Sequence, residues 1–122
     1  MIRVLIADDH PLLREGLKLI CSETKDIHVV DEASNGEEVL DKVKKDDFDV
    51  LVLDINMPRK GGFEVLDELR ASGNKIPVLV LSTYSEEDYK ELAIKAGAAG
   101  YLTKEQAPDR LIEEIRRVSK GG

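Results

Sequence analysis

The chain has 122 residues, of which 42% are hydrophobic and 35% charged, and its formal net charge is -7. The length fits one domain, the hydrophobic content argues against a disordered chain, and the acidic charge argues against a protein that grips nucleic acid through clustered cations. No apolar run approaches the about 20 residues of a membrane helix, and the chain begins without a secretory signal. We therefore expect a cytoplasmic protein that binds no membrane.

Short apolar runs mark the candidate strands. Four of them are strong and the second in chain order is weaker; the runs are residues 4–7, 27–33, 50–53, 78–81 and 100–102. Continuous apolar runs of this length, without the alternation of a half-exposed strand, are typical of parallel strands covered on both faces. We expect these runs to form the centre of a sheet.

Helical spacing of apolar residues follows each of these runs. The predicted inward faces are, in chain order, Leu13, Leu17, Ile20 and Cys21; Val39, Leu40 and Val43; Val65, Leu66 and Leu69; Leu92, Ala93 and Ala96; and Leu111, Ile115 and Val118. The spacing within each set is that of one helix face. Cys21 has no partner cysteine, so neither a disulfide nor a cysteine-rich zinc site can form within the chain, and we expect a small buried residue there.

Start and stop signals agree with five helices. Asn35 and Ser85 are residue types that commonly precede a helix, and Pro108 suits the first turn of the last one. Gly73 and Gly97 are suited to helix ends, where the chain often enters the left-handed region.

Strict alternation of strand and helix indicates the fold class. It predicts an α/β protein whose parallel strands are joined by right-handed crossovers. The expected architecture is a five-stranded parallel sheet in the flavodoxin-like order 2-1-3-4-5, with five helices distributed over both faces.

Polar side chains follow the apolar runs at the expected carboxyl ends of the strands. Asp8 and Asp9 follow the first run, Asp54 the third, Ser82 the fourth, and Lys104 ends the segment after the fifth. In an open parallel sheet, ligands bind outside these strand ends, at the point where the strand order reverses. The first and third strands flank that point in the order 2-1-3-4-5, so we expect the three carboxylates to converge.

Three carboxylates at one edge repel one another unless a cation lies between them. Oxygen ligands without a cysteine or a histidine pair favour a hard ion, and few protein ligands suit Mg²⁺ better than Ca²⁺. An aspartate that is flanked by a metal and a lysine can take up a phosphoryl group, because both cations offset the charge on the phosphoryl oxygens.

Each of these residues also has a purely structural interpretation. Asp8 and Asp9 could cap the following helix, and Asp54 could be a solvated loop acid. Lys104 could be an ordinary exposed lysine, and Ser82 could simply end a strand instead of donating its hydroxyl to a phosphoryl oxygen.

Other residues have no chemistry that spacing alone predicts. Tyr101 lies in an apolar run, so a core tyrosine is the default interpretation, and residues 57–62 are typical of a turn. His10 and His28 have no partner at a metal-ligand spacing, and we assign them no function.

Four separated motifs carry a family resemblance. They are Asp8-Asp9, residues 54–58 with Gly62, Ser82-Thr83 and residues 101–104. With these motifs in this order at strand ends, the chain resembles the CheY-like receiver domain of two-component response regulators, from residue 2 to about residue 118.

The resemblance implies a role for each motif residue. Asp54 would accept a phosphoryl group from a sensor histidine kinase, and Asp9 and Asp54 would bind Mg²⁺ directly. The backbone carbonyl of Asn56 would be a third ligand, and Asp8 would act largely through water. Lys104 would contact the phosphoryl group. The switch pair would be Ser82 and Tyr101.

Two segments resemble the NarL/FixJ branch, also called LuxR-type: residues 8–16 and 96–102. Members of that branch usually carry a helix-turn-helix DNA-binding domain after the receiver. The expected domains are thus a receiver at 1–118 and the start of a linker at 119–122, with the chain ending before an output domain could begin. Many receivers outside this branch have proline where Glu105 stands, so a cis bond after Lys104 is less expected.

The function that the resemblance implies is a phosphorylatable receiver that switches a transcription regulator. It would be no enzyme beyond self-phosphorylation and autodephosphorylation, would bind no nucleic acid itself, and could dimerise on phosphorylation. The alternative is a stand-alone relay or motor-binding receiver.

Two other families with strand-end sites fit less well. A haloacid-dehalogenase-type phosphatase resembles a pattern with a second aspartate where this chain has Asn56, which supplies no general acid or base. A flavodoxin-like carrier needs phosphate-binding donors where this chain has Asp8 and Asp9, which would repel phosphate.

Overall fold

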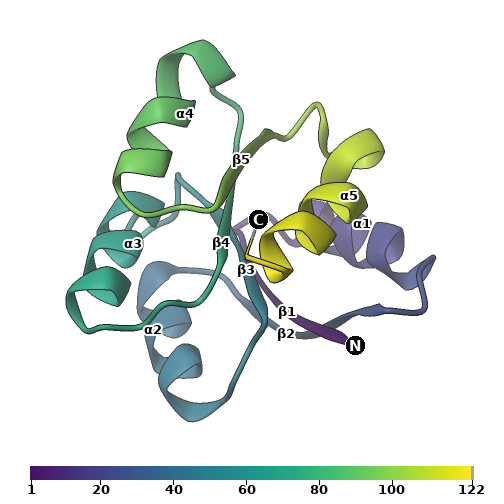
Figure 1. Ribbon diagram of the computed structural model, residues 1–122, viewed down its shortest axis with the longest axis horizontal. Helices are drawn as coiled ribbons and strands as arrows, with labels where there is room; N and C mark the ends of the chain where they lie inside the picture. The colour runs from purple at the N-terminus through teal and green to yellow at the C-terminus, as the bar shows by residue number, and fades with distance from the viewer. Residues whose placement is uncertain (122) are drawn as a thin grey trace.

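Five strands alternate with five helices in the computed structural model, which describes residues 1–121 (Figure 1). The elements are β1 (Ile2–Ala7), α1 (Pro11–Ser22), β2 (Ile27–Ala33), α2 (Gly36–Lys45), β3 (Val50–Asp54), α3 (Gly62–Ala71), β4 (Val78–Ser82), α4 (Glu86–Lys95), β5 (Gly100–Thr103) and α5 (Ala107–Ser119).

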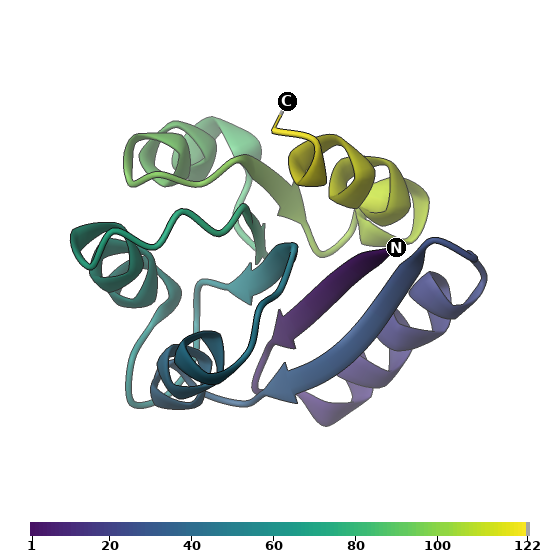
Figure 2. The same ribbon diagram turned by 60° about the horizontal axis from the view of Figure 1, so that its bottom comes forward.

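The sheet has the predicted topology. Its strands are parallel and lie in the order β2-β1-β3-β4-β5, which confirms the predicted fold class. Helices α1 and α5 cover one face of the sheet, and α2, α3 and α4 cover the other (Figures 1 and 2). Because β1 pairs with both β2 and β3, the strand order reverses between β1 and β3.

Alternating residues of the central strands build a core on each face. In β3, Leu51 and Leu53 pack with residues of α2, α3 and α4, whereas Val50 and Val52 pack with residues of α1 and α5. All residues of β3 and β4 are buried. Each apolar side chain of these two strands stabilises the fold by about 1.5 to 3 kcal/mol through burial. Burial on both faces of the sheet explains why these runs lack the alternation of a half-exposed strand.

Local signals set most helix boundaries as predicted. The side chain of Asn35 accepts a hydrogen bond from the amide of Glu38 at 2.9 Å and so caps α2. Gly73 and Gly97, with φ of +84° and +108°, follow the ends of α3 and α4. Ser85 precedes α4, but its hydroxyl donates to the carboxylate of Asp88 at 3.0 Å instead of capping the backbone.

The predicted inward face of α4 is wrong at Leu92. Of the residues of α4, only Ala93 is buried, and the side chains of Leu92 and Ile94 are 53% and 44% exposed. Helix α4 lies beside β5, the edge strand, so only a narrow stripe of the helix meets the sheet (Figure 1). Helix α4 therefore carries more apolar side chains than the edge of the sheet can cover.

The loop between β3 and α3 is held close to the end of β3. The amide of Gly62 donates to the carbonyl oxygen of Ile55 at 2.8 Å. A Cβ atom at Gly62 would lie 2.6 Å from the carbonyl oxygen of Asp54, so only glycine fits this approach. Arg59 has φ of 68°, a left-handed conformation within the predicted turn.

Three further features concern the whole chain. No helix within residues 1–121 has both the length and the apolar character needed to span a membrane. The same residues contain no cis peptide bond, including the bond after Lys104. Cys21 on α1 is 1% exposed, and burial raises the pKa of its thiol to about 11.

Candidate functional site

The carboxyl ends of four strands place the polar residues of the site. Asp8 directly follows β1, Asp54 ends β3, Ser82 ends β4, and Lys104 directly follows β5. Asp8 and Asp54 are each 1% exposed and Ser82 is fully buried. Asp8 and Asp54 thus lie where the strand order reverses between β1 and β3, which is where parallel sheets bind their ligands, and Ser82 lies beside them at the end of the neighbouring strand β4.

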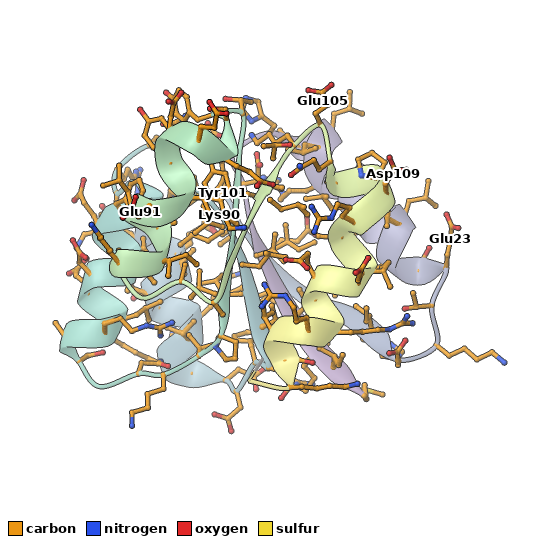
Figure 3. All side chains as sticks on the ribbon, turned by 45° about the horizontal axis from the view of Figure 1, so that its top comes forward. Glu23, Lys90, Glu91, Tyr101, Glu105 and Asp109 are labelled. Atoms are coloured by element: carbon orange, nitrogen blue, oxygen red, sulfur yellow. The ribbon has the colours of Figure 1, made fainter. Side chains whose placement is uncertain are left out.

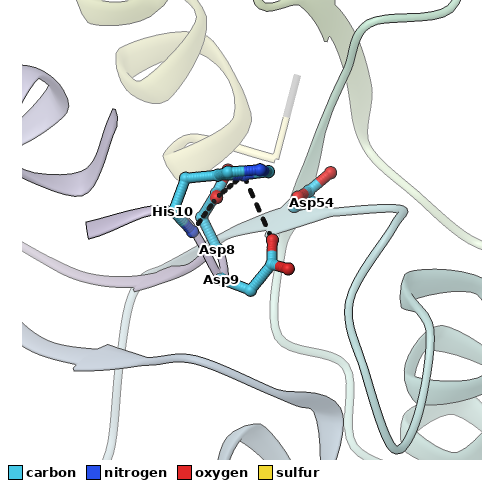
Figure 4. Close-up of side chains that lie close together, drawn as sticks. All are labelled: Asp8, Asp9, His10 and Asp54. Carbon is cyan, nitrogen blue, oxygen red and sulfur yellow. Dashed lines mark hydrogen bonds and ion pairs between the residues drawn. The ribbon is translucent and has the colours of Figure 1, made fainter. Parts of the chain in front are cut away.

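Four potential metal ligands gather at this point. Atoms of Asp8, Asp9, His10 and Asp54 that can bind a metal all lie within 4.8 Å of one another (Figure 4). The structure therefore brings together the three carboxylates that the sequence places at strand ends. It adds His10, to which we assigned no function because the sequence has no second histidine at a metal-ligand spacing from it.

Lys104 lies against two of the carboxylates. Its Nζ atom is 3.3 Å from Oδ2 of Asp8 and 3.3 Å from Oδ2 of Asp54, and its side chain is 17% exposed. The ammonium group thus partly offsets the charge of the buried acids. It is not the exposed lysine of the structural interpretation.

Burial raises the pKa of Asp54 above its ordinary value. The negative charge of Asp8 raises this pKa further. The amide of Asn56, which donates to Oδ1 of Asp54 at 3.2 Å, and the ammonium of Lys104 oppose these effects without cancelling them. The carboxylate form of Asp54 is therefore destabilised in this fold, and a bound cation would relieve it.

The site fits a divalent cation. Oδ2 of Asp8 and Oδ1 of Asp9 are buried, and neither accepts a hydrogen bond from any residue in the described part of the chain. Their neighbours Lys104 and His10 lie 3.3 Å and 3.1 Å away, in positions that do not satisfy these oxygens as acceptors. Unsatisfied carboxylate oxygens in an acidic cluster are suitable ligands for a hard cation.

Ser82 and Tyr101 are linked through Tyr84 in the loop before α4. The hydroxyl of Ser82 accepts a hydrogen bond from the amide of Tyr84 at 3.0 Å, and the hydroxyl of Tyr101 donates to the carbonyl oxygen of Tyr84 at 2.7 Å. Tyr101 lies between α4 and α5 and is 3% exposed (Figure 3). Burial raises the pKa of its phenol. The ring of Tyr101 is therefore turned inward in this structure.

Gln106 is a second residue that sequence reasoning missed. Its side-chain amide donates to Oε1 of Glu86 on α4 at 3.0 Å and accepts from the amide of Thr103 at 3.0 Å. The loop that carries Lys104 is thereby joined to the first turn of α4. No local sequence pattern predicts this contact, because Gln106 and Glu86 are 20 residues apart and only the folded chain brings them together.

Comparisons with known proteins point to one family. Residues 4–116 match the model of the response regulator receiver domain. The chain is 40% identical over 121 residues to the transcriptional regulatory protein DegU of Brevibacillus brevis, covering 99% of this chain and 51% of that protein. It is also 40% identical over 118 residues to the nitrate/nitrite response regulator protein NarL of Escherichia coli K12, covering 97% of this chain and 55% of that protein.

A solved structure agrees with these relatives. The signal receiver domain of the putative response regulator NarL from Mycobacterium tuberculosis superposes with a TM-score of 0.92 at 33% identity, covering 99% of this chain and 98% of that one. The chain spans about half the length of the curated relatives that it matches, 51% and 55%.

Proposed function

Since the chain belongs to the family of response regulator receiver domains, in its NarL/LuxR-type branch, we propose that Asp54 accepts a phosphoryl group from a sensor histidine kinase. The observation that carries this proposal is the burial of Asp54 at the end of β3, between Asp8 and the ammonium of Lys104. The carboxylate is the nucleophile, and the kinase's phosphohistidine is the donor.

The surrounding residues have distinct roles in this reaction. Asp9, Asp54 and the backbone carbonyl of Asn56 would hold Mg²⁺, and Asp8 would act on the ion largely through water. When bound, Mg²⁺ offsets the charge on the phosphoryl oxygens. Lys104 contacts one of these oxygens, since its ammonium already lies beside Asp54. Asn56 supplies no general acid or base for turnover of external phosphate esters, so the domain is a signal transducer and no general phosphatase.

Phosphorylation switches the surface formed by α4, β5 and α5. The new phosphoryl oxygens attract the hydroxyl of Ser82, which now accepts from Tyr84. Movement of Ser82 shifts the loop before α4 and the carbonyl that holds Tyr101. Because Tyr101 is already inward here, phosphorylation stabilises this position instead of creating it.

The output of the full-length protein is transcription regulation. The receiver extends over residues 1–118, and a linker to a helix-turn-helix DNA-binding domain begins at 119–122, of which Gly122 lies outside the described residues. Helix α5 continues to Ser119, so the linker begins as helix. The acidic receiver itself leaves DNA to that domain, acts in the cytoplasm and can dimerise when phosphorylated. The alternative remains a stand-alone relay or motor-binding receiver.

Intact-mass measurement tests the phosphoryl acceptor. Acetyl phosphate or phosphoramidate with Mg²⁺ should add one phosphoryl group to the wild type and none to Asp54→Asn, because the amide is no nucleophile. The exposed Asp67→Asn is the matched control and should react like the wild type. Uptake by Asp54→Asn at the wild-type rate would disprove the assignment, and EDTA should abolish uptake by the wild type.

Beryllofluoride, which mimics the phosphoryl group, tests the switch. With Mg²⁺ it should change the NMR shifts of Ser82 and of the loop before α4, and it should make the Tyr101 ring resonances sharper and more uniform, as expected when one rotamer is selected. Unchanged shifts of Ser82 and Tyr101 would contradict this mechanism.

A further inference from the structure

The imidazole of His10 lies against the carboxylates of the proposed metal site. Its Nδ1 atom is 3.0 Å from Oδ1 of Asp8 and 3.1 Å from Oδ1 of Asp9. In Figure 4 the ring extends over Asp8 toward Asp9 and Asp54. Nitrogen and carboxylate ligands of one ion, each about 2.1 Å from it, are at most about 4.2 Å apart. The separations here, all within 4.8 Å, need only a small adjustment to reach that range.

The only side-chain hydrogen bond of His10 within the described residues joins its Nδ1 to Oδ1 of Asp8 at 3.0 Å, so no contact holds the ring away from the acids. His10 precedes α1 in an extended conformation, with φ of -100° and ψ of 104°, and its side chain makes no capping hydrogen bond. The side chain is 64% exposed, so the ring contributes little to the core and can turn at low cost. By contrast, Nε2 of His28 lies 3.2 Å from the carbonyl oxygen of Lys25.

A second observation concerns two carboxylate oxygens of the site, which accept no hydrogen bond from the described residues. Oδ1 of Asp9, the atom that faces Nδ1 of His10, is buried and accepts no hydrogen bond within residues 1–121. Oδ2 of Asp8, which is 1% exposed as a residue, is unsatisfied in the same way on the side of Lys104. A cation would satisfy these oxygens, and the imidazole of His10 supplies the one nitrogen among the four potential metal ligands gathered there.

From this arrangement we propose that His10 Nδ1 binds the cation together with the carboxylates, which gives the site mixed nitrogen and oxygen ligands. Imidazole nitrogen favours first-row transition-metal ions over Mg²⁺. The site therefore selects an ion such as Mn²⁺ over Mg²⁺ more strongly than its carboxylates alone would. The inference rests on the cation site of the proposed function and concerns which ion occupies it.

Pulsed electron paramagnetic resonance of Mn²⁺ bound to the untagged chain tests the contact directly. The wild type should show a coupling from a bound imidazole ¹⁴N, and labelling of histidine with ¹⁵N should replace it by a ¹⁵N coupling. This comparison needs no variant and so does not depend on the folding of a mutant. A wild type that binds Mn²⁺ without any histidine nitrogen coupling overturns the inference.

Two matched variants identify which histidine is the ligand. His10→Ala should remove the coupling and His28→Ala should retain it. Competition between Mg²⁺ and Mn²⁺ should show the preference for Mn²⁺ falling by about tenfold in His10→Ala, the low end of what loss of a metal-site partner costs, and remaining constant in His28→Ala. An unchanged preference in His10→Ala overturns the inference.

Failure of this inference can be told apart from failure of the proposed function. If the wild type takes up a phosphoryl group on Asp54 in excess Mg²⁺ but its bound Mn²⁺ shows no nitrogen coupling, only the role of His10 is disproved. If the nitrogen coupling is present and no phosphoryl group is taken up, His10 is a ligand and the proposed phosphorylation is disproved.

Discussion

Helices α4 and α5 flank the same edge strand, β5, but are anchored in different ways. Five residues of α5 are buried, and all of them except Glu114 belong to the core that α5 shares with α1: Ala107, Leu111, Ile115 and Val118. Helix α4 buries only Ala93 and leaves Leu92 more than half exposed. Helix α5 is thus held in place by buried apolar side chains, whereas α4 depends much more on hydrogen bonds near its first turn.

Those polar contacts connect α4 to the functional site. Tyr101 holds the carbonyl of Tyr84, and Gln106 holds the carboxylate of Glu86. Moving α4 disturbs a few hydrogen bonds and little buried surface, while moving α5 would open the core. A small charge change can displace a weakly anchored element more easily than a strongly anchored one. We therefore expect α4 to move on phosphorylation and α5 to stay in place.

The largest effect should come from truncating one leucine on each helix. Leu111→Ala on α5 should lower the free energy of unfolding by about 3 kcal/mol, since it leaves a cavity in the core. Leu92→Ala on α4 should change it by less than about 0.5 kcal/mol. Urea denaturation measures both values. Similar losses in the two variants would remove the basis of the comparison.

Removing the charge of Asp54 should stabilise the whole fold without Mg²⁺. Burial and the charge of Asp8 raise its pKa, so the folded chain binds a proton that the unfolded chain has released as pH rises above about 4. The wild type therefore loses stability as pH rises from the ordinary carboxyl pKa of about 4 through the raised pKa of folded Asp54. Asp54→Asn has no charge at this position and avoids the loss. We expect Asp54→Asn to be more stable by about 1 to 2 kcal/mol at pH 7 and nearly equal at pH 4.

Thermal or urea unfolding in EDTA at both pH values checks this expectation. Saturating Mg²⁺ should close the gap, because a ligand that binds only the folded state at about 100 times its Kd stabilises it by about 2.7 kcal/mol. A gap that is the same at pH 4 and pH 7 would show that the charge of Asp54 is not its cause.

Tyr101→Phe should loosen α4 selectively. The variant keeps the ring but loses the hydrogen bond from the hydroxyl to the carbonyl of Tyr84, which should cost about 1 kcal/mol. Hydrogen exchange should speed up in the amides of α4 and remain as in the wild type in α5. Equal acceleration in both helices would mean that Tyr101 supports the core and does not tether α4.

The smallest expected effect belongs to Gln106→Ala. Loss of its contacts with Glu86 and Thr103 should lower stability by about 0.5 kcal/mol, since Gln106 lies near the surface and water replaces the bonds. Exchange should increase in the first turn of α4. The exposed neighbour Glu105→Ala is the control and should leave that turn unchanged.

The architecture could be predicted from the sequence because four of the five strands are mostly buried apolar runs and each helix carries a local signal; β2, at the edge of the sheet, buries only Ile27 and Ala33. The cap at Asn35 and the glycines after α3 and α4 act within a few residues. Convergence of Asp8 with Asp54 followed from the same pattern, since the topology fixes where the strand ends meet.

What the sequence did not reveal depends on contacts between distant segments. Leu92 has the spacing of an inward residue, but a helix beside an edge strand has little sheet to cover. Gln106 meets Glu86, and His10 meets the acids, through loops whose positions no periodicity encodes. The inward position of Tyr101 is likewise a property of the packed state and has no local signal.

The buried thiol of Cys21 can report how often the fold opens. Cys21 is the chain's only cysteine, and its buried thiol, with a pKa of about 11, is a poor nucleophile for alkylating reagents while the fold is closed. Its labelling rate therefore measures how often the side of the sheet covered by α1 and α5 opens. In the variant Leu92→Cys, the new thiol on the exposed surface of α4 should react much faster than Cys21. One reagent then measures the labelling rates of both sites in a single protein, without removal of the native thiol.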